Sequence, residues 1–316
     1  MLNKFASKIS TTVRASTDRG SSSHAQEGAH LHSRVLESVP SLAGPLLSQI
    51  FLTPGRRFRR QSKRTKFARP LATRIACVNI KGHSIDVFAR GKGPVVLLVH
   101  GWQSGRERLD PLGEAISASG YTVVTWDMPA HGKSPGRTTS LPQFVEAILT
   151  VSKLVGSVHS IVGHSLGATA TALALRRGLS VQTAVLVAPM ISFDFALDQF
   201  QKFLRLSSSL RELTATHTES RVNLRRGEAD LLSLPSPSCP VLLIHDEKDE
   251  RTPLFHSQSL AERWKPEGFM VTKGLGHSRL LADKHVLERV VSFVGEACAS
   301  GCAWERFFSC APELRL

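Results

Sequence analysis

The chain has 316 residues, of which 41% are hydrophobic and 21% are charged, a balance typical of a globular protein with a sizeable core. Its formal net charge is +14, but 13 of the 40 Lys and Arg residues and only three of the 26 acidic residues lie within residues 1–70. That segment therefore carries +10 and residues 71–316 carry only +4, which argues against nucleic-acid binding by the main domain.

The five cysteines are odd in number and contain no Cys-x-x-Cys pair, so the sequence predicts neither a zinc site nor a disulfide framework. We therefore expect a reduced, cytoplasmic setting. A mitochondrial alternative rests on residues 1–14, where apolar residues recur at helical spacing between basic ones, a pattern that resembles a presequence. Residues 1–35 are rich in Ser and Thr and are expected to be largely disordered.

Residues 39–52 form the first predicted helix, because seven apolar side chains between Val39 and Phe51 fall on one helical face. A dense basic run over 55–64 follows this helix. Two interpretations stay open. The helix packs on its own domain and the arginines belong to a solvated linker, or the basic N-terminal extension (residues 1–70) makes a weak contact with an anionic membrane surface or an acidic partner.

From residue 73 onward, strands and helices alternate. The run over 94–99 is continuously apolar, as in a parallel strand buried on both faces. Strands are predicted over 73–80, 83–90, 94–99, 121–127, 158–163, 183–188, 240–245 and 268–272, and helices over 106–118, 141–154, 166–177, 255–263 and 283–297. This pattern predicts an α/β domain over residues 71–298, with a mostly parallel central sheet, helices on both faces, and a tail over 299–316.

About fifty residues between Pro189 and Pro240 break the alternation, with apolar residues at helical spacing and no strand pattern. We expect a small helical cap inserted at about residues 191–235. Its Phe193 and Phe195 are candidates for the wall of a hydrophobic substrate pocket, although a cap must also bury a core of its own.

The motif with the clearest chemistry is Gly163-His164-Ser165-Leu166-Gly167, between a predicted strand and a helix of small residues. A serine at so sharp a turn needs flanking glycines, because side chains there would collide. This context predicts a nucleophile elbow with Ser165 as the nucleophile. A serine also needs a base and the base an acid. His277 follows the last predicted strand, and the aspartates at 246 and 249 compete for the role of acid.

Three motifs together resemble the signatures of the α/β-hydrolase superfamily, in particular bacterial esterase/lipase-type serine hydrolases with a short helical cap. They are the elbow, His100-Gly101-Trp102, and the segment from Asp127 to Ser134. The resemblance spans about residues 73–297. It implies that Asp127 supports the site structurally. It also implies that the catalytic acid is the second aspartate of the pattern after the strand, Asp249, while Asp246 suits a turn-forming role.

Acyl transfer at Ser165 develops negative charge on an oxygen, which backbone N–H groups must stabilise. In this superfamily the expected donors are Leu166, directly after the nucleophile, and Trp102, in the loop after the first parallel strand. Gln103 lies beside them and is a candidate pocket residue.

The sequence thus favours a serine hydrolase of carboxylic esters with small or medium hydrophobic acyl or aryl groups, which needs no metal and no organic cofactor. Its expected partner is a small-molecule ester. A thioesterase, an acyltransferase or a carbon–carbon bond hydrolase would use the same residues, because the pocket selects the substrate. A non-catalytic, ligand-sensing protein of the same fold is the alternative from another class.

Overall fold

The computed structural model describes residues 36–55 and 72–299. The presequence-like pattern over 1–14, nearly all of the basic run over 55–64 and the tail therefore lie outside the described residues. The chain divides into two compact units. The helical unit includes residues 36–52 and 193–223, and the sheet unit includes 72–192 and 224–299. Ser165, Asp249 and His277 all belong to the sheet unit.

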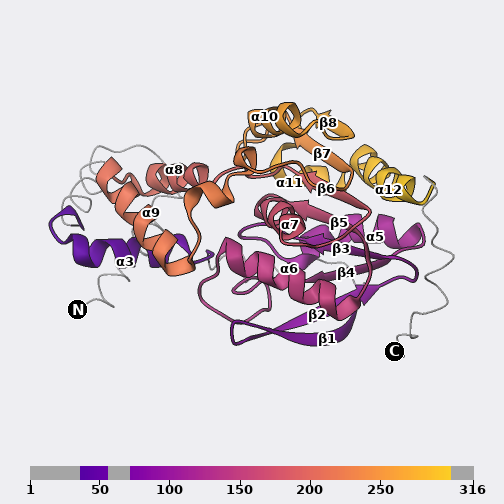
Figure 1. The fold of residues 1–316 in the computed structure, drawn as a ribbon, viewed down its shortest axis with the longest axis horizontal. Coiled ribbons are helices and arrows are strands. Elements are labelled where there is room, and N and C mark those ends of the chain that lie inside the picture. The colour runs from indigo at the N-terminus through magenta and orange to yellow at the C-terminus, as the bar shows by residue number, and fades with distance from the viewer. Residues whose placement is uncertain (1–35, 56–71, 300–316) are drawn as a thin grey trace. The chain divides into compact units, whose positions relative to one another are not determined.

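The sheet unit is built on one sheet with the strand order β1-β2-β4-β3-β5-β6-β7-β8 (Figure 1). The strands are β1 (Thr73–Ile80), β2 (His83–Arg90), β3 (Val95–Val99), β4 (Thr122–Trp126), β5 (Val158–His164), β6 (Thr183–Val187), β7 (Val241–Asp246) and β8 (Gly268–Thr272). β2 pairs antiparallel with β1 and with β4, whereas the pairs from β4 to β8 are parallel. The carboxyl ends of the parallel strands meet at one edge, where open α/β sheets bind their ligands.

Helices cover both faces of this sheet (Figure 1). On one face lie α6 (Leu141–Val155), α7 (Leu166–Arg176) and α10 (Phe255–Trp264), and on the other α5 (Asp110–Ala118) and α12 (Lys284–Ala299). Short turns complete the unit: η1 (Arg106–Leu109), η2 (Arg226–Ala229), η3 (Leu231–Ser233), α11 (Gly276–Arg279) and η4 (Leu280–Ala282). No helix in the described ranges combines the length and apolarity that crossing a membrane requires.

Alternate residues of the central strands supply two separate cores. In β3, Leu97 and Val99 pack in the cluster that contains α6 and α7, while Val96 and Leu98 pack in the cluster that contains α5 and α12. Successive side chains of a strand point to opposite faces, so a strand covered on both sides must be apolar throughout. This explains the unbroken apolar run over 95–99.

The predicted α/β class and the mostly parallel sheet are confirmed, and most element ends agree with the prediction to within two residues. The helix predicted over 106–118 is wrong in one respect, because it consists of the 3-10 turn η1 followed by α5. Pro111 has no N–H to donate to the carbonyl group of Glu107, so an α-helical hydrogen-bond ladder cannot run through this point.

The helical unit consists of α3 (Pro40–Phe51), α8 (Phe193–Leu204) and α9 (Ser208–Val222). The apolar face of α3 packs against α9 in a cluster that includes Leu47 and Leu210. A buried hydrogen bond of 3.0 Å from Thr218 Oγ1 to Ser48 Oγ joins the same two helices. The amphipathic helix of the N-terminal extension therefore uses its apolar face within the protein.

The segment expected as a cap at 191–235 is divided between the two units. Its first part forms α8 and α9, whereas residues from Leu224 onward belong to the sheet unit. There, Leu231 and Leu234 are buried in the same core as α6 and α7.

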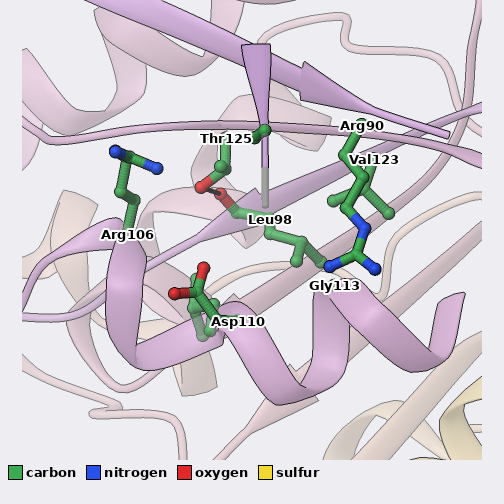
Figure 2. A pocket seen from close by; sticks show the side chains of 9 residues that line it. Arg90, Leu98, Arg106, Asp110, Gly113, Val123 and Thr125 are labelled. Atoms are coloured by element: carbon green, nitrogen blue, oxygen red, sulfur yellow. Dashed lines mark hydrogen bonds between the residues drawn. The ribbon is translucent and has the colours of Figure 1, made fainter. Parts of the chain in front are cut away.

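A small cavity lies between α5 and the strands β3 and β4, and Figure 2 shows the side chains that line it. Its volume of about 20 Å³ has room for a water molecule. Asp110 is the acidic residue of its lining, and burial raises the pKa of this carboxyl group to about 6. Ser165, Asp249 and His277 do not line this cavity.

Candidate active site

Ser165 lies at the turn from β5 into α7, at the carboxyl-end edge of the sheet. Its backbone φ of +56° and ψ of −124° are unfavourable for any residue other than glycine, at a cost of about 1–3 kcal/mol. The Ser165 N–H donates to Val187 O at 2.9 Å, which holds the turn against β6. Ser165 thus has the strained backbone that the elbow motif predicts.

The two glycines of the motif are required by close packing. A Cβ added to Gly163 would lie 2.6 Å from both Gly167 O and Thr171 Oγ1. A Cβ added to Gly167 would lie 2.5 Å from the carbonyl oxygens of Val99 and His100. Both distances are shorter than any ordinary nonbonded contact, so α7 approaches β5 and β3 only because these positions lack side chains.

His277 and Asp249 form the hydrogen bond that a catalytic base and its acid require. His277 Nδ1 lies 2.7 Å from Asp249 Oδ2, and both side chains are almost completely buried. A carboxylate accepts, so we assign the proton to Nδ1, which leaves His277 Nε2 as the basic nitrogen. Asp249 is held in turn by the backbone N–H groups of Arg251 and Thr252, at 2.9 and 3.0 Å, and by Thr252 Oγ1 at 3.0 Å.

The surroundings of Asp249 keep it ionised. Burial by itself raises the pKa of the carboxyl group, but the hydrogen bonds from His245, His277 and the Thr252 backbone outweigh this effect. The pKa of Asp249 therefore lies well below its usual range. At neutral pH the carboxylate carries the negative charge that stabilises an imidazolium on its partner.

Asp246, the competing aspartate, accepts hydrogen bonds from backbone N–H groups and a threonine hydroxyl group, and none from the imidazole of His277. Its two oxygens accept from Gly276 N, Lys248 N, Leu275 N and Thr272 Oγ1, at 2.8, 2.9, 2.9 and 2.7 Å. Burial alone raises the pKa of Asp246, but these four donors hold it below its ordinary value. Two of them directly precede His277 in the chain, so Asp246 anchors the loop while Asp249 contacts the ring.

His164 fastens this loop to the elbow. Its Nε2–H donates to the carbonyl oxygen of His277 at 2.8 Å, and the ring centroids lie 4.6 Å apart. Burial, and next the charge of His277, lower the pKa of His164 to about 3, so the ring is neutral. Among the described residues, neither the Ser165 hydroxyl group nor His277 Nε2 has a hydrogen-bond partner. Catalytic contacts of this kind are often long before substrate binds.

Two buried histidines hold the loop that carries Trp102 and Gln103. His100 Nδ1–H donates to Gly101 O at 2.8 Å, and its Nε2 accepts from Met128 N at 2.9 Å. His131 Nε2 accepts from Gln103 N at 3.0 Å, where Gln103 has a φ of +52°. Burial lowers the pKa of His100, consistent with a neutral ring that accepts at Nε2.

Leu166, one of the two expected oxyanion donors, directly follows the serine. Leu166 is the first residue of α7, so its N–H has no acceptor within the helix. A Cβ added to Gly101 would lie 2.8 Å from Ser165 Cβ and 3.4 Å from Ser165 Oγ, which places the loop of Trp102 against the nucleophile. The Trp102 ring packs edge-on against His131, with centroids 5.3 Å apart. The indole thus contributes to packing, while the catalytic role of the Trp102 backbone N–H stays a prediction.

The other predicted pocket residues stay predictions. Phe193 belongs to the helical unit, where it packs edge-on against Phe51 with centroids 5.6 Å apart, and Phe195 lies on the same helix. In the described part of the chain, no three His, Cys, Asp or Glu side chains are grouped so as to hold a metal ion.

Asp127 has the supporting role that the resemblance implies. Its Oδ1 accepts from Arg106 N at 2.8 Å and its Oδ2 from Lys133 N at 3.0 Å. No role was predicted from the sequence for His131, His164 or Thr252. The Asp-x-Pro-x-His-Gly pattern over residues 127–132 was the available signal for His131, since it places a histidine four residues after the structural aspartate.

The comparisons with known proteins agree with this fold. The sequence profile of the alpha/beta hydrolase family matches residues 96–291, which is more than half of the chain, and the chain belongs to this family. The monoacylglycerol lipase of Paleococcus ferrophilus shares the fold, with a TM-score of 0.52 and 22% identity over 67% of this chain and 99% of that one.

Two relatives are similar in sequence over part of their length. A monoglyceride lipase homolog of monkeypox virus is 30% identical over 109 residues, which make up 32% of this chain and 40% of the relative. A pimeloyl-(acyl-carrier protein) methyl ester esterase of Nitrosomonas europaea is 36% identical over 107 residues, 33% of this chain and 41% of the relative. The chain thus spans about two fifths of the length of these curated relatives.

Proposed function

We propose that this hydrolase is a serine esterase that cleaves carboxylic esters through an acyl-enzyme on Ser165. The observation that carries the proposal is the 2.7 Å hydrogen bond between His277 Nδ1 and Asp249 Oδ2, in a loop tied by His164 to the strained elbow. A base oriented by an ionised, buried acid beside an elbow serine is the arrangement that acyl transfer needs.

In the acylation step, His277 Nε2 takes the proton of the Ser165 hydroxyl as Oγ attacks the ester carbonyl carbon. The negative charge that develops on the carbonyl oxygen is stabilised by the N–H groups of Leu166 and Trp102. Collapse of the tetrahedral intermediate breaks the bond to the alkoxy group, which leaves as the alcohol with the proton from His277. Asp249 stays ionised and stabilises the imidazolium from the moment His277 accepts the serine proton until it gives that proton to the leaving alcohol.

Deacylation repeats these steps with water as the nucleophile. His277 Nε2 removes a proton from the water molecule, the hydroxide adds to the acyl carbonyl group, and Ser165 Oγ leaves with that proton. The carboxylic acid is released and the serine is regenerated. Each group in this cycle belongs to the chain itself or to water.

The substrate class proposed is a carboxylic ester with a small or medium hydrophobic acyl or aryl group. The two relatives support the choice of ester, since one is named a monoglyceride lipase homolog and the other a methyl ester esterase.

Labelling with a fluorescent fluorophosphonate tests the nucleophile. The wild-type protein should be labelled, and Ser165→Ala should lose the label while its circular dichroism spectrum stays unchanged. Ser117→Ala is the matched control, because this serine is half-buried on α5 and its hydroxyl group bonds only Glu114 O of the same helix. Labelling that persists without Ser165 would exclude it as the nucleophile.

A panel of p-nitrophenyl esters from acetate to laurate then tests the reaction. We expect Ser165-dependent turnover with an optimum at short or medium chains. Matched thioester and alcohol-acceptor assays separate the thioesterase and acyltransferase alternatives. A folded protein that binds esters with no Ser165-dependent turnover of any of them would support the ligand-sensing alternative instead.

A further inference from the structure

His245, the penultimate residue of β7, is completely buried beside Asp249, and the acyl-transfer mechanism gives it no role. Both nitrogens of its ring make close polar contacts. Nε2 lies 2.6 Å from Thr252 O and 3.4 Å from Asp249 Oδ2, while Nδ1 lies 2.7 Å from Ser257 Oγ. A strand residue with this set of contacts joins β7, the turn that bears the acid and α10.

These contacts define the tautomer of His245. A carbonyl oxygen accepts but cannot donate, so the short contact to Thr252 O requires the hydrogen on Nε2. In the neutral ring, Nδ1 then accepts from the Ser257 hydroxyl group. The Nε2–H group faces two acceptors of one turn, the carbonyl oxygen of Thr252 and the carboxylate of Asp249.

Asp249 Oδ2 therefore faces two imidazole rings. His277 Nδ1 donates to it at 2.7 Å, and His245 Nε2 lies farther away at 3.4 Å. A donor that stabilises the charge of a carboxylate weakens the attraction of that carboxylate for its other partners. The His245 N–H thus opposes the pull of Asp249 on the His277 imidazolium.

We propose that His245 is a positioning residue of the catalytic acid. His245 holds the Asp249–Thr252 turn and weakens the attraction between Asp249 and the protonated His277 ring. The inference rests on the proposed serine-esterase function, because it concerns the base of that reaction.

Other titratable groups also act near Asp249 and its two imidazole partners. His256 on α10 acts electrostatically with His245 and Asp249, and burial, followed by the charge of His245, lowers the pKa of His256 to about 4. His164 on β5 lies against His277, and Arg108 on η1 adds a positive charge that acts on His164. Since His164 and His256 stay neutral near pH 6 to 7, neither ring adds a charge beside Asp249 in that range.

Two substitutions separate the role of the His245 N–H group as a donor from the role of the side chain in filling the core. His245→Leu removes the donor, whereas His245→Gln keeps an amide N–H near the position of Nε2. His159→Leu is the matched control, because His159 is also a buried strand histidine whose Nε2 bonds a carbonyl oxygen, Val294 O at 2.9 Å. His159 lies near the start of β5, at the end of the strand opposite to Ser165. Two measurements are made on each protein: the NMR titration curve of the His277 Cε1 proton and the acid limb of kcat/KM with p-nitrophenyl butyrate.

In His245→Leu, the midpoint of the His277 titration and the acid limb of kcat/KM should both move upward by roughly half a pH unit. Without the His245 N–H, the charge of Asp249 stabilises the His277 imidazolium more strongly. His245→Gln should stay near the wild type, and His159→Leu should not move. If His245→Leu does not fold, His245→Asn replaces it, since its shorter amide reaches only the position of Nδ1. A downward or absent shift on loss of the donor, or an equal shift in the Gln variant, overturns the proposal. The NMR titration does not depend on turnover, so an inactive wild type would refute the esterase function and still leave the role of His245 decided.

Discussion

Replacing Asp249 with Asn tests which aspartate supports the base. The Asn oxygen can still accept from the N–H groups of Arg251 and Thr252, which bind Asp249 Oδ1 at 2.9 and 3.0 Å. Its NH2 group then takes the place of Oδ2, opposite His277 Nδ1. Because NH2 donates, the imidazole must accept at Nδ1 and carry its proton on Nε2, where it can no longer take the proton of Ser165.

The expected loss follows from this wrong tautomer. The equivalent change in serine proteases lowers kcat about 10⁴-fold, so we expect a decrease of about 10³ to 10⁴, or roughly 4–5.5 kcal/mol in the activation barrier. The free energy of unfolding should fall by about 2–4 kcal/mol, because His277 Nδ1 and Thr252 Oγ1 both lose their charged acceptor. The fold should therefore persist while turnover collapses.

The assay is kcat for p-nitrophenyl butyrate, together with urea unfolding of each protein. Asp283→Asn is the matched control, since Asp283 accepts from the N–H groups of His285 and Val286 at the start of α12, far along the chain from the acid. The control should retain kcat. Activity of Asp249→Asn within tenfold of the wild type, or an equal loss in the control, would refute the assignment of the acid.

Three further changes test the structure around the site. Asp246→Asn should lower the free energy of unfolding by about 2–4 kcal/mol at pH 7, because two of four donors lose their acceptor. The pKa of Asp246 is depressed in the folded state, so this difference should be complete above pH about 4 and shrink below it; a pH-independent difference in urea titrations would contradict the reasoning. Asp110→Asn should instead stabilise the protein by about 1–2 kcal/mol at pH 8, after allowance for partial exposure, and by much less at pH 4. Its raised pKa of about 6 means that the wild type loses stability as the pH rises from about 4 to 6, and equal stability of both proteins at pH 8 would exclude this effect. Gly163→Ala should cost about 1–3 kcal/mol and slow fluorophosphonate labelling at least tenfold, because its Cβ would lie 2.6 Å from Thr171 Oγ1. Gly227→Ala, where an added Cβ meets nothing within 4 Å, should leave labelling unchanged; equal labelling rates in both variants would show that the elbow tolerates the side chain.

Local sequence determined the parts of this protein whose physics is local. The apolar run over 95–99 could only be a strand covered on both faces, and it is one. The glycines around Ser165 likewise indicated a tight turn between strand and helix, because only residues without a side chain permit that approach. The α/β class and the order of most elements followed from such patterns.

Local sequence could not distinguish the aspartates on physical grounds alone. Asp246 and Asp249 are three residues apart at the end of one strand, with the same turn propensities, and only the resemblance to a family favoured the second. The tertiary structure decides, because His277 is 28 residues beyond Asp249 and its ring is brought to Oδ2 by the pairing of β7 with β8.

The neutral histidines show the same dependence on distant contacts. His131 holds Gln103 across 28 residues of sequence, and His164 holds His277 across 113. α3 finds its partner in α9, about 170 residues later, as the bond between Ser48 and Thr218 shows. An isolated helical pattern reveals that an apolar face must be buried, but which surface buries it depends on packing that only the folded chain provides.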